Sequence, residues 1–91
     1  MTDNYVFKLY VVNTASASQK IVKKIKKFLD EAGIKYSLEV IDVLENPELT
    51  VDAGIAATPT LVKEAPPPVK KIVGRLDDKQ KVLVGLGIKE A

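Results

Sequence analysis

A strand, a long helix and a second strand follow one another in the first half of this 91-residue chain, and this order most narrows its possible folds. Residues Tyr5–Val12 form a β-branched and aromatic run with one charge, which is typical of a strand buried on both faces. A helix is predicted to begin at Ser16, and Gly33 after it supplies the left-handed conformation that ends many helices. The helix has one apolar stripe, made of Ile21, Ile25, Phe28, Leu29 and Ala32. Together with a strand at Tyr36–Val43, this order predicts a parallel βαβ unit.

Three shorter elements are predicted in the second half. Asn46-Pro47-Glu48 combines a capping side chain, a proline at the first helical position and an acid in the first turn, so we expect a short helix to about Gly54. Two apolar runs, Thr60–Glu64 and Val69–Val73, flank a proline-rich segment and predict an antiparallel hairpin. Asp77 is the predicted N-cap of a terminal segment, which runs from Asp78 to Ile88.

The terminal segment fits both a helix and a strand. As a helix it has an apolar stripe, although two glycines each cost about 1 kcal/mol relative to alanine. As a strand it alternates apolar and other residues, and most of its apolar residues are β-branched. The residues concerned are Val82, Leu83 and Leu86 for the helix, Val82, Val84, Leu86 and Ile88 for the strand, and the glycines Gly85 and Gly87. Two packings that differ by a few kcal/mol would permit a fold switch.

Composition excludes most common catalytic sites. The chain has no cysteine and no histidine, which removes thiolate nucleophiles, disulfides and the usual zinc ligands. Fourteen lysines and arginines against 12 acids give a net charge of only +2, too small a surplus to indicate nucleic-acid binding. The sequence shows no signal peptide and no apolar run near the roughly 18 residues that span a bilayer. We expect one cytoplasmic domain over residues 1–91, without cofactor, metal, membrane contact or enzymatic activity.

The predicted order β-α-β-(short α)-β-β-α is the layout of a thioredoxin-like α/β domain, and Thr58-Pro59-Thr60 lies where such domains carry a cis-proline. Three further motifs are specific: Val40-Ile41-Asp42-Val43-Leu44-Glu45-Asn46-Pro47, Ala57-Thr58-Pro59-Thr60-Leu61, and Pro66-Pro67-Pro68-Val69. Lys8-Leu9-Tyr10-Val11 opens the chain and Lys81-Val82-Leu83-Val84-Gly85-Leu86 lies near its end. Together these segments resemble the KaiB family of clock proteins over almost the whole chain.

The resemblance implies a binding protein with two states, a tetramer with its own fold and a thioredoxin-like monomer. The monomer would bind a KaiC-like hexameric ATPase and then recruit or sequester KaiA-like or histidine-kinase components. A second branch of the family is the N-terminal sensory domain of the kinase SasA. Because this chain ends at Ala91 without a kinase, we expect the free-standing form.

The resemblance also implies roles for individual residues. We expect a partner-binding surface at Lys20, Tyr36, Ser37, Glu39 and Lys63, and fold-switch positions at Tyr5, Pro59, Pro66, Pro67, Pro68, Gly85 and Gly87. X-Pro bonds isomerise in about 10 to 100 s, so a switch that used the three consecutive prolines would be slow. Glu39, Gly54 and Gly87 depart from the family pattern, which usually has lysine, lysine and aspartate there.

Each of these interpretations has a simpler counterpart. The five lysines between Lys20 and Lys27 form either a docking surface or a solvated face that pairs with Asp30 and Glu31 one turn later. Pro59 is either a recognition element or the turn before a strand, and Ser16, followed by Gln19, fits an N-cap better than a nucleophile. The alternative from another class is a glutathione-binding enzyme of thioredoxin fold.

Overall fold

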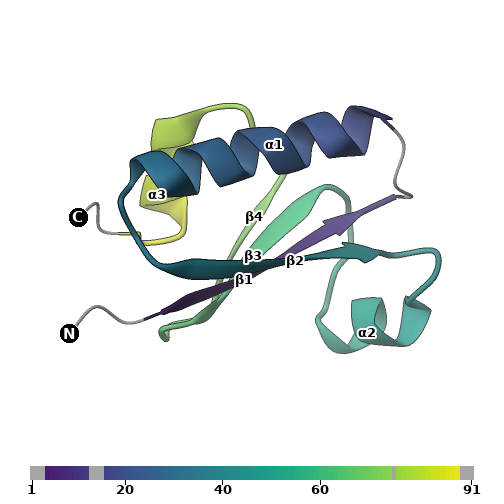
Figure 1. The fold of residues 1–91 in the computed structure, drawn as a ribbon. Helices are drawn as coiled ribbons and strands as arrows, with labels where there is room; N and C mark the ends of the chain where they lie inside the picture. Colours follow the sequence, from purple (N-terminus) through teal and green to yellow (C-terminus); the bar gives the residue numbers. More distant parts are fainter. Residues whose placement is uncertain (1–3, 13–15, 75, 89–91) are drawn as a thin grey trace.

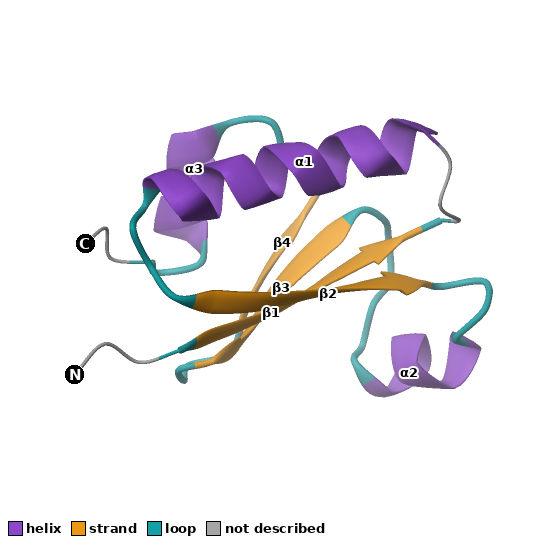
Figure 2. Ribbon diagram, viewed as in Figure 1, coloured by secondary structure: helices purple, strands orange, loops and turns teal. Residues whose placement is uncertain are grey.

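The computed structural model describes residues 4–12, 16–74 and 76–88, and in them a four-stranded sheet carries two helices on one face (Figures 1 and 2). The strand order is β2-β1-β3-β4. Strand β1 (Tyr5–Val11) pairs in parallel with β2 (Tyr36–Asp42) and antiparallel with β3 (Thr60–Ala65), which pairs antiparallel with β4 (Lys70–Val73). The predicted thioredoxin-like layout is confirmed, and the apolar first strand lies between two others, as its composition indicates.

Helix α1 (Ser16–Glu31) covers the middle of the sheet, and its predicted stripe faces the core. Ile25, Leu29 and Ala32 are buried, and Ile21 and Phe28 pack against them. Gly33 has a φ of 72°, so the predicted left-handed end of the helix is confirmed. The predicted capping contact of the Ser16 side chain lies outside the described part of the chain. The principal core forms between α1 and the β1 side chains Phe7, Leu9 and Val11.

A smaller core lies on the other face of the sheet, near the carboxyl end of β2. Tyr10, Ile41 and Val62 form its centre, and Val43, Ala53 and Ile55, on either side of α2 (Pro47–Asp52), pack against them, while α2 itself has no buried residue. Asn46 is the N-cap residue of α2, as predicted, but its side chain caps no helical N–H, because its amide donates to the Asp42 carbonyl oxygen at 3.0 Å. The remainder of this face is left open by the described helices.

The terminal segment is helical in this structure, where α3 spans Lys79–Gly85 beside α1 (Figure 2). Val82, Leu83 and Leu86 are buried, whereas Val84, which the strand pattern would place with Val82, is exposed. The N-cap is Asp78 rather than the predicted Asp77, since the Asp78 carboxylate accepts a hydrogen bond from the Lys81 amide at 3.2 Å. The helix therefore begins one residue later than the sequence indicates.

Prolines lie at both ends of β3. The Thr58–Pro59 bond is cis, as the thioredoxin-like layout implies, and it lies directly before β3. The Ala65–Pro66 and Pro67–Pro68 bonds in the loop between β3 and β4 are also cis. The predicted antiparallel hairpin is confirmed, with each strand starting or ending one residue from the expected position.

Candidate partner-binding surface

The five residues predicted to bind partners lie in four separate places. Lys20 is exposed on α1, while Ser37 and Glu39 are exposed on the open face of β2. Tyr36, although adjacent to Ser37, points to the opposite face because side chains alternate along a strand. Lys63 is buried in β3, on the face covered by the helices. The fold therefore does not bring all five into one continuous patch.

Tyr36 connects β2 to the last turns of α1. Its hydroxyl donates to the Asp30 carboxylate at 2.8 Å and lies 3.4 Å from the Lys26 carbonyl oxygen. Burial, the hydrogen bond to Asp30 and the charge of Asp30 together raise the pKa of Tyr36 to about 12. The ring also meets Phe7 edge to face, with centroids 6.3 Å apart. Tyr36 thus stabilises the packing of α1 against β2.

The open face of the sheet carries a short row of charges. The Lys8 ammonium lies 3.2 Å from a Glu64 carboxylate oxygen, and Lys8 is the register partner of Glu39 on β2. The hydrogen bond and the charge of Glu64 raise the pKa of Lys8. Burial is the main cause of the raised pKa of the neighbouring Tyr10. Lys71 of β4 is the register partner of Val62, which pairs with Lys8, so a second ammonium lies on this face and balances the second carboxylate.

Lys63 lies beside the carboxyl end of α3 and opposite Lys70 on β4. It is 3% exposed, and within the described ranges no acidic side chain pairs with it. Gly87, with a φ of 66°, lies against both lysines: a Cβ at this position would be 3.7 Å from Lys70 Cε and 3.9 Å from Lys63 Nζ. Two lysine side chains therefore converge beside a glycine in the left-handed conformation. No sequence motif indicates that Lys70 belongs to this group.

Lys20 borders a hollow of about 420 Å³ beside the cis-proline. Ile21, Pro59 and Leu76 form its apolar lining, and Lys24 and Asp77 add charge at its edge. The Pro59 carbonyl oxygen accepts a hydrogen bond from the Gly74 amide at 3.0 Å, so it is engaged within the domain. This contact accords with a structural role for Pro59 in joining the two loops.

Most of the predicted fold-switch residues gather at one end of the sheet. Tyr5 begins β1 and stacks on Phe7 with ring centroids 5.8 Å apart. The next residue of β1, Val6, pairs with Ala65, so Pro66–Pro68 follow directly beside it. The last two positions, Gly85 and Gly87, lie against β4, whereas Pro59 lies at the other end of β3.

The α1 lysines do not form the predicted pairs with the acids one turn later. Asp30 accepts its hydrogen bond from Tyr36, and Glu31 lies 3.7 Å from the Lys79 ammonium of α3. Within residues 4–12, 16–74 and 76–88, no group of three acidic side chains is placed to hold a metal ion. No described helix is long and apolar enough to cross a membrane.

Comparison with known families matches residues 8–88 to the KaiB domain. The chain belongs to the KaiB family. It is 50% identical over 86 residues to the circadian clock oscillator protein KaiB of Microcystis aeruginosa, covering 92% of this chain and 82% of that protein. KaiB1 of Synechocystis is 49% identical over 86 residues and covers 92% of this chain and 81% of the relative. The family predicted from the motifs is therefore confirmed.

Among solved structures, the N-terminal domain of Synechococcus elongatus SasA matches the whole of this KaiB-family chain and 90% of its own, with a TM-score of 0.78 and 30% identity. Chloroplastic thioredoxin z matches 93% of this chain and 77% of its own, with a TM-score of 0.69 at 20% identity. The second likeness establishes the thioredoxin-like fold alone.

Proposed function

We propose that this KaiB-family chain is a non-enzymatic clock regulator that binds a KaiC-like ATPase ring in the thioredoxin-like state described above. Two observations together support the proposal. The sequence is about half identical to KaiB proteins, and its fold matches the SasA N-terminal domain along the whole length of this chain. The identity to KaiB relatives, 50% against 30% for the SasA domain, favours the KaiB branch. The absence of cysteine and histidine also favours binding over catalysis.

The two basic positions would contact acidic groups of the ATPase. Lys20 is exposed on α1, and Lys63 lies with Lys70 beside the end of α3. An approaching carboxylate would meet the exposed Lys70, whereas Lys63 is 3% exposed and would be reached only if the end of α3 moved away. Ser37 and Glu39 lie on the open face of β2 and Tyr36 on the opposite face, away from Lys20 and Lys63, so we assign this strand to a different component, such as a KaiA-like or histidine-kinase partner.

A pull-down with the purified ATPase ring, run with ATP and with ADP, tests the central proposal. We expect retention under at least one nucleotide, and retention should fall when Lys63 is changed by Lys63→Met, which keeps most of the buried volume. Lys27→Gln, an exposed α1 substitution away from Lys20 and Lys63, is the matched control and should not change retention. Loss of retention under both nucleotides for the unmodified chain would contradict the proposal.

We also propose the second, tetrameric state that the family resemblance implies. Tyr5, Pro66–Pro68, Gly85 and Gly87 would rearrange between the thioredoxin-like monomer and a tetramer. We infer that Glu39 and Gly87 shift the balance toward the monomer, because Gly87 has a φ of 66° in the thioredoxin-like state, a conformation that costs glycine less than aspartate. Size-exclusion chromatography with light scattering should show a monomer of 9.9 kDa at micromolar concentration. A stable tetramer would contradict this inference.

A further inference from the structure

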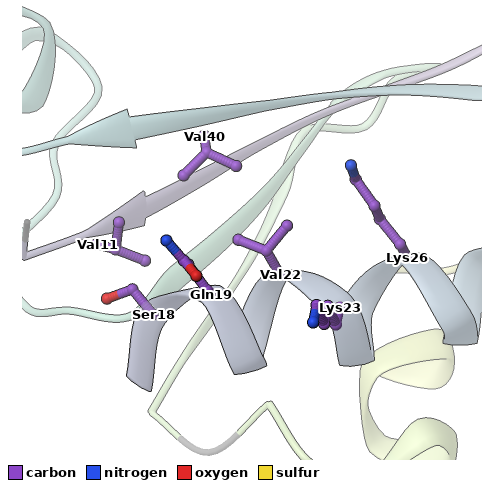
Figure 3. A pocket seen from close by; sticks show the side chains of 7 residues that line it. All are labelled: Val11, Ser18, Gln19, Val22, Lys23, Lys26 and Val40. Carbon is purple, nitrogen blue, oxygen red and sulfur yellow. The ribbon is translucent and has the colours of Figure 1, made fainter. Parts of the chain in front are cut away.

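A groove separates the amino-terminal half of α1 from the carboxyl end of β2, and neither Lys20 nor Lys63 lines it (Figure 3). Its volume is about 380 Å³, within the range of small-ligand sites of roughly 300 to 1,000 Å³. Val11, Val22 and Val40 line it with aliphatic side chains. Val40 shares a face with Tyr36 and is still 38% exposed, so α1 leaves this end of the strand uncovered.

The ionisable groups along this groove are all cationic. Lys23 and Lys26 extend from α1, and Figure 3 shows Lys26 reaching toward the strand that carries Val40. No carboxylate lines the groove, and within the described chain neither lysine forms an ion pair. The nearest acid along the helix, Asp30, is already bonded to the Tyr36 hydroxyl. The Ser18 side chain adds a polar group near the start of the helix.

We propose that this groove binds an aliphatic monocarboxylate, with its hydrocarbon chain against the three valines and its carboxylate at Lys26. The apolar lining favours a chain without polar substituents, because burying an unpaired polar group is unfavourable. The cationic border favours an anionic head group over a neutral or positive one. This site goes beyond the proposed binding of an ATPase and does not depend on it.

A chain-length series with the intact protein tests the site. Butanoate, hexanoate and octanoate are titrated against ¹⁵N-labelled protein, and the shifts of amides near Val22 and Val40 are followed. Affinity should rise by up to about fourfold for each added methylene group, because each buried methylene contributes a nearly constant transfer free energy. Octylammonium, with the same chain and the opposite charge, should bind at least tenfold more weakly than octanoate. Equal binding of the two octyl compounds, or none of octanoate at millimolar concentration, would overturn the proposal.

Two substitutions and one control locate the binding. Lys26→Gln should weaken octanoate binding at least threefold, and Val40→Asp should abolish it, whereas Lys27→Gln, on the same helix but outside the groove, should leave it unchanged. Amide spectra verify that each variant is folded, and Val40→Thr replaces Val40→Asp if that variant is not. Equal effects of Lys26→Gln and Lys27→Gln would overturn the proposal. So would dimerisation of the protein in place of ligand binding, because a second copy would then be the occupant.

Discussion

Helices α1 and α3 lie on the same face of the sheet, yet they depend on different levels of structure. The 16 residues of α1 carry one apolar stripe, which is compatible with a helix alone. The seven residues of α3 are fewer than the roughly 12 to 15 that an isolated helix needs, and their pattern fits a strand equally well. Packing of Val82, Leu83 and Leu86 on the core therefore decides the conformation of α3. Local sequence fixes one helix, and tertiary contacts fix the other.

The largest loss of stability should come from a substitution on the core face of α1. Leu29 is fully buried, so Leu29→Ala should lower the free energy of unfolding by about 2 to 5 kcal/mol, through lost transfer free energy and the cavity left behind. Denaturant unfolding measures the loss, and the exposed Lys27→Ala is the control. A loss below about 1 kcal/mol would show that α1 contributes less to the core than its burial indicates.

A smaller effect is expected where α3 ends. A Cβ at Gly87 would meet nothing closer than 3.7 Å, so the cost of Gly87→Val is that of the left-handed backbone, about 1 to 2 kcal/mol. Gly87→Asn should cost less, since asparagine tolerates this conformation better. Thermal or denaturant unfolding of the two variants measures the difference. Equal stability of Gly87→Val and the unmodified protein would contradict the left-handed end of α3.

The beginning of α3 offers a matched pair of aspartates. Asp78→Ala removes the side chain that accepts from the Lys81 amide and should cost about 1 kcal/mol. Asp77→Ala should have little effect, because Asp77 does not cap the helix. Hydrogen exchange of the α3 amides, compared with those of α1, reports where protection is lost. The reverse order of the two variants would place the cap where the sequence alone predicts it.

The smallest effect at neutral pH concerns the attachment of α1 to β2. Tyr36→Phe removes one hydrogen bond to Asp30, a change of about 0.5 to 1.5 kcal/mol. The folded-state pKa of Tyr36 is raised from 10.0 to about 12, so its contribution is fully present below pH 10 and is lost as the pH rises toward 12. The stability difference between the unmodified protein and Tyr36→Phe should therefore shrink across this window. A constant difference between pH 9 and 12 would contradict the assignment.

Much of the fold could be predicted from the sequence, but less of the candidate surface. Periodicity located the α1 stripe, and the apolar run of β1 indicated its central position. By contrast, nothing in the sequence shows that Lys63 is buried or that Lys70 and Gly87 lie beside it, because that grouping requires the β3–β4 register and the docking of α3. The division of the β2 residues is different, because alternation in the predicted strand already turns Tyr36 away from Ser37 and Glu39, and the structure confirms it.

The sequence by itself determined the βαβ unit, the family and the α1 helix, because each depends on local periodicity or on contiguous motifs. Only the tertiary structure decided that Asp78–Ile88 contains a helix, that Asp78 caps it and that the lysines of β3 and β4 converge at its end. The physical reason is that a short segment with two compatible patterns gains most of its stability from the surface it covers. For α3, that surface is supplied by β4 and the core beneath it.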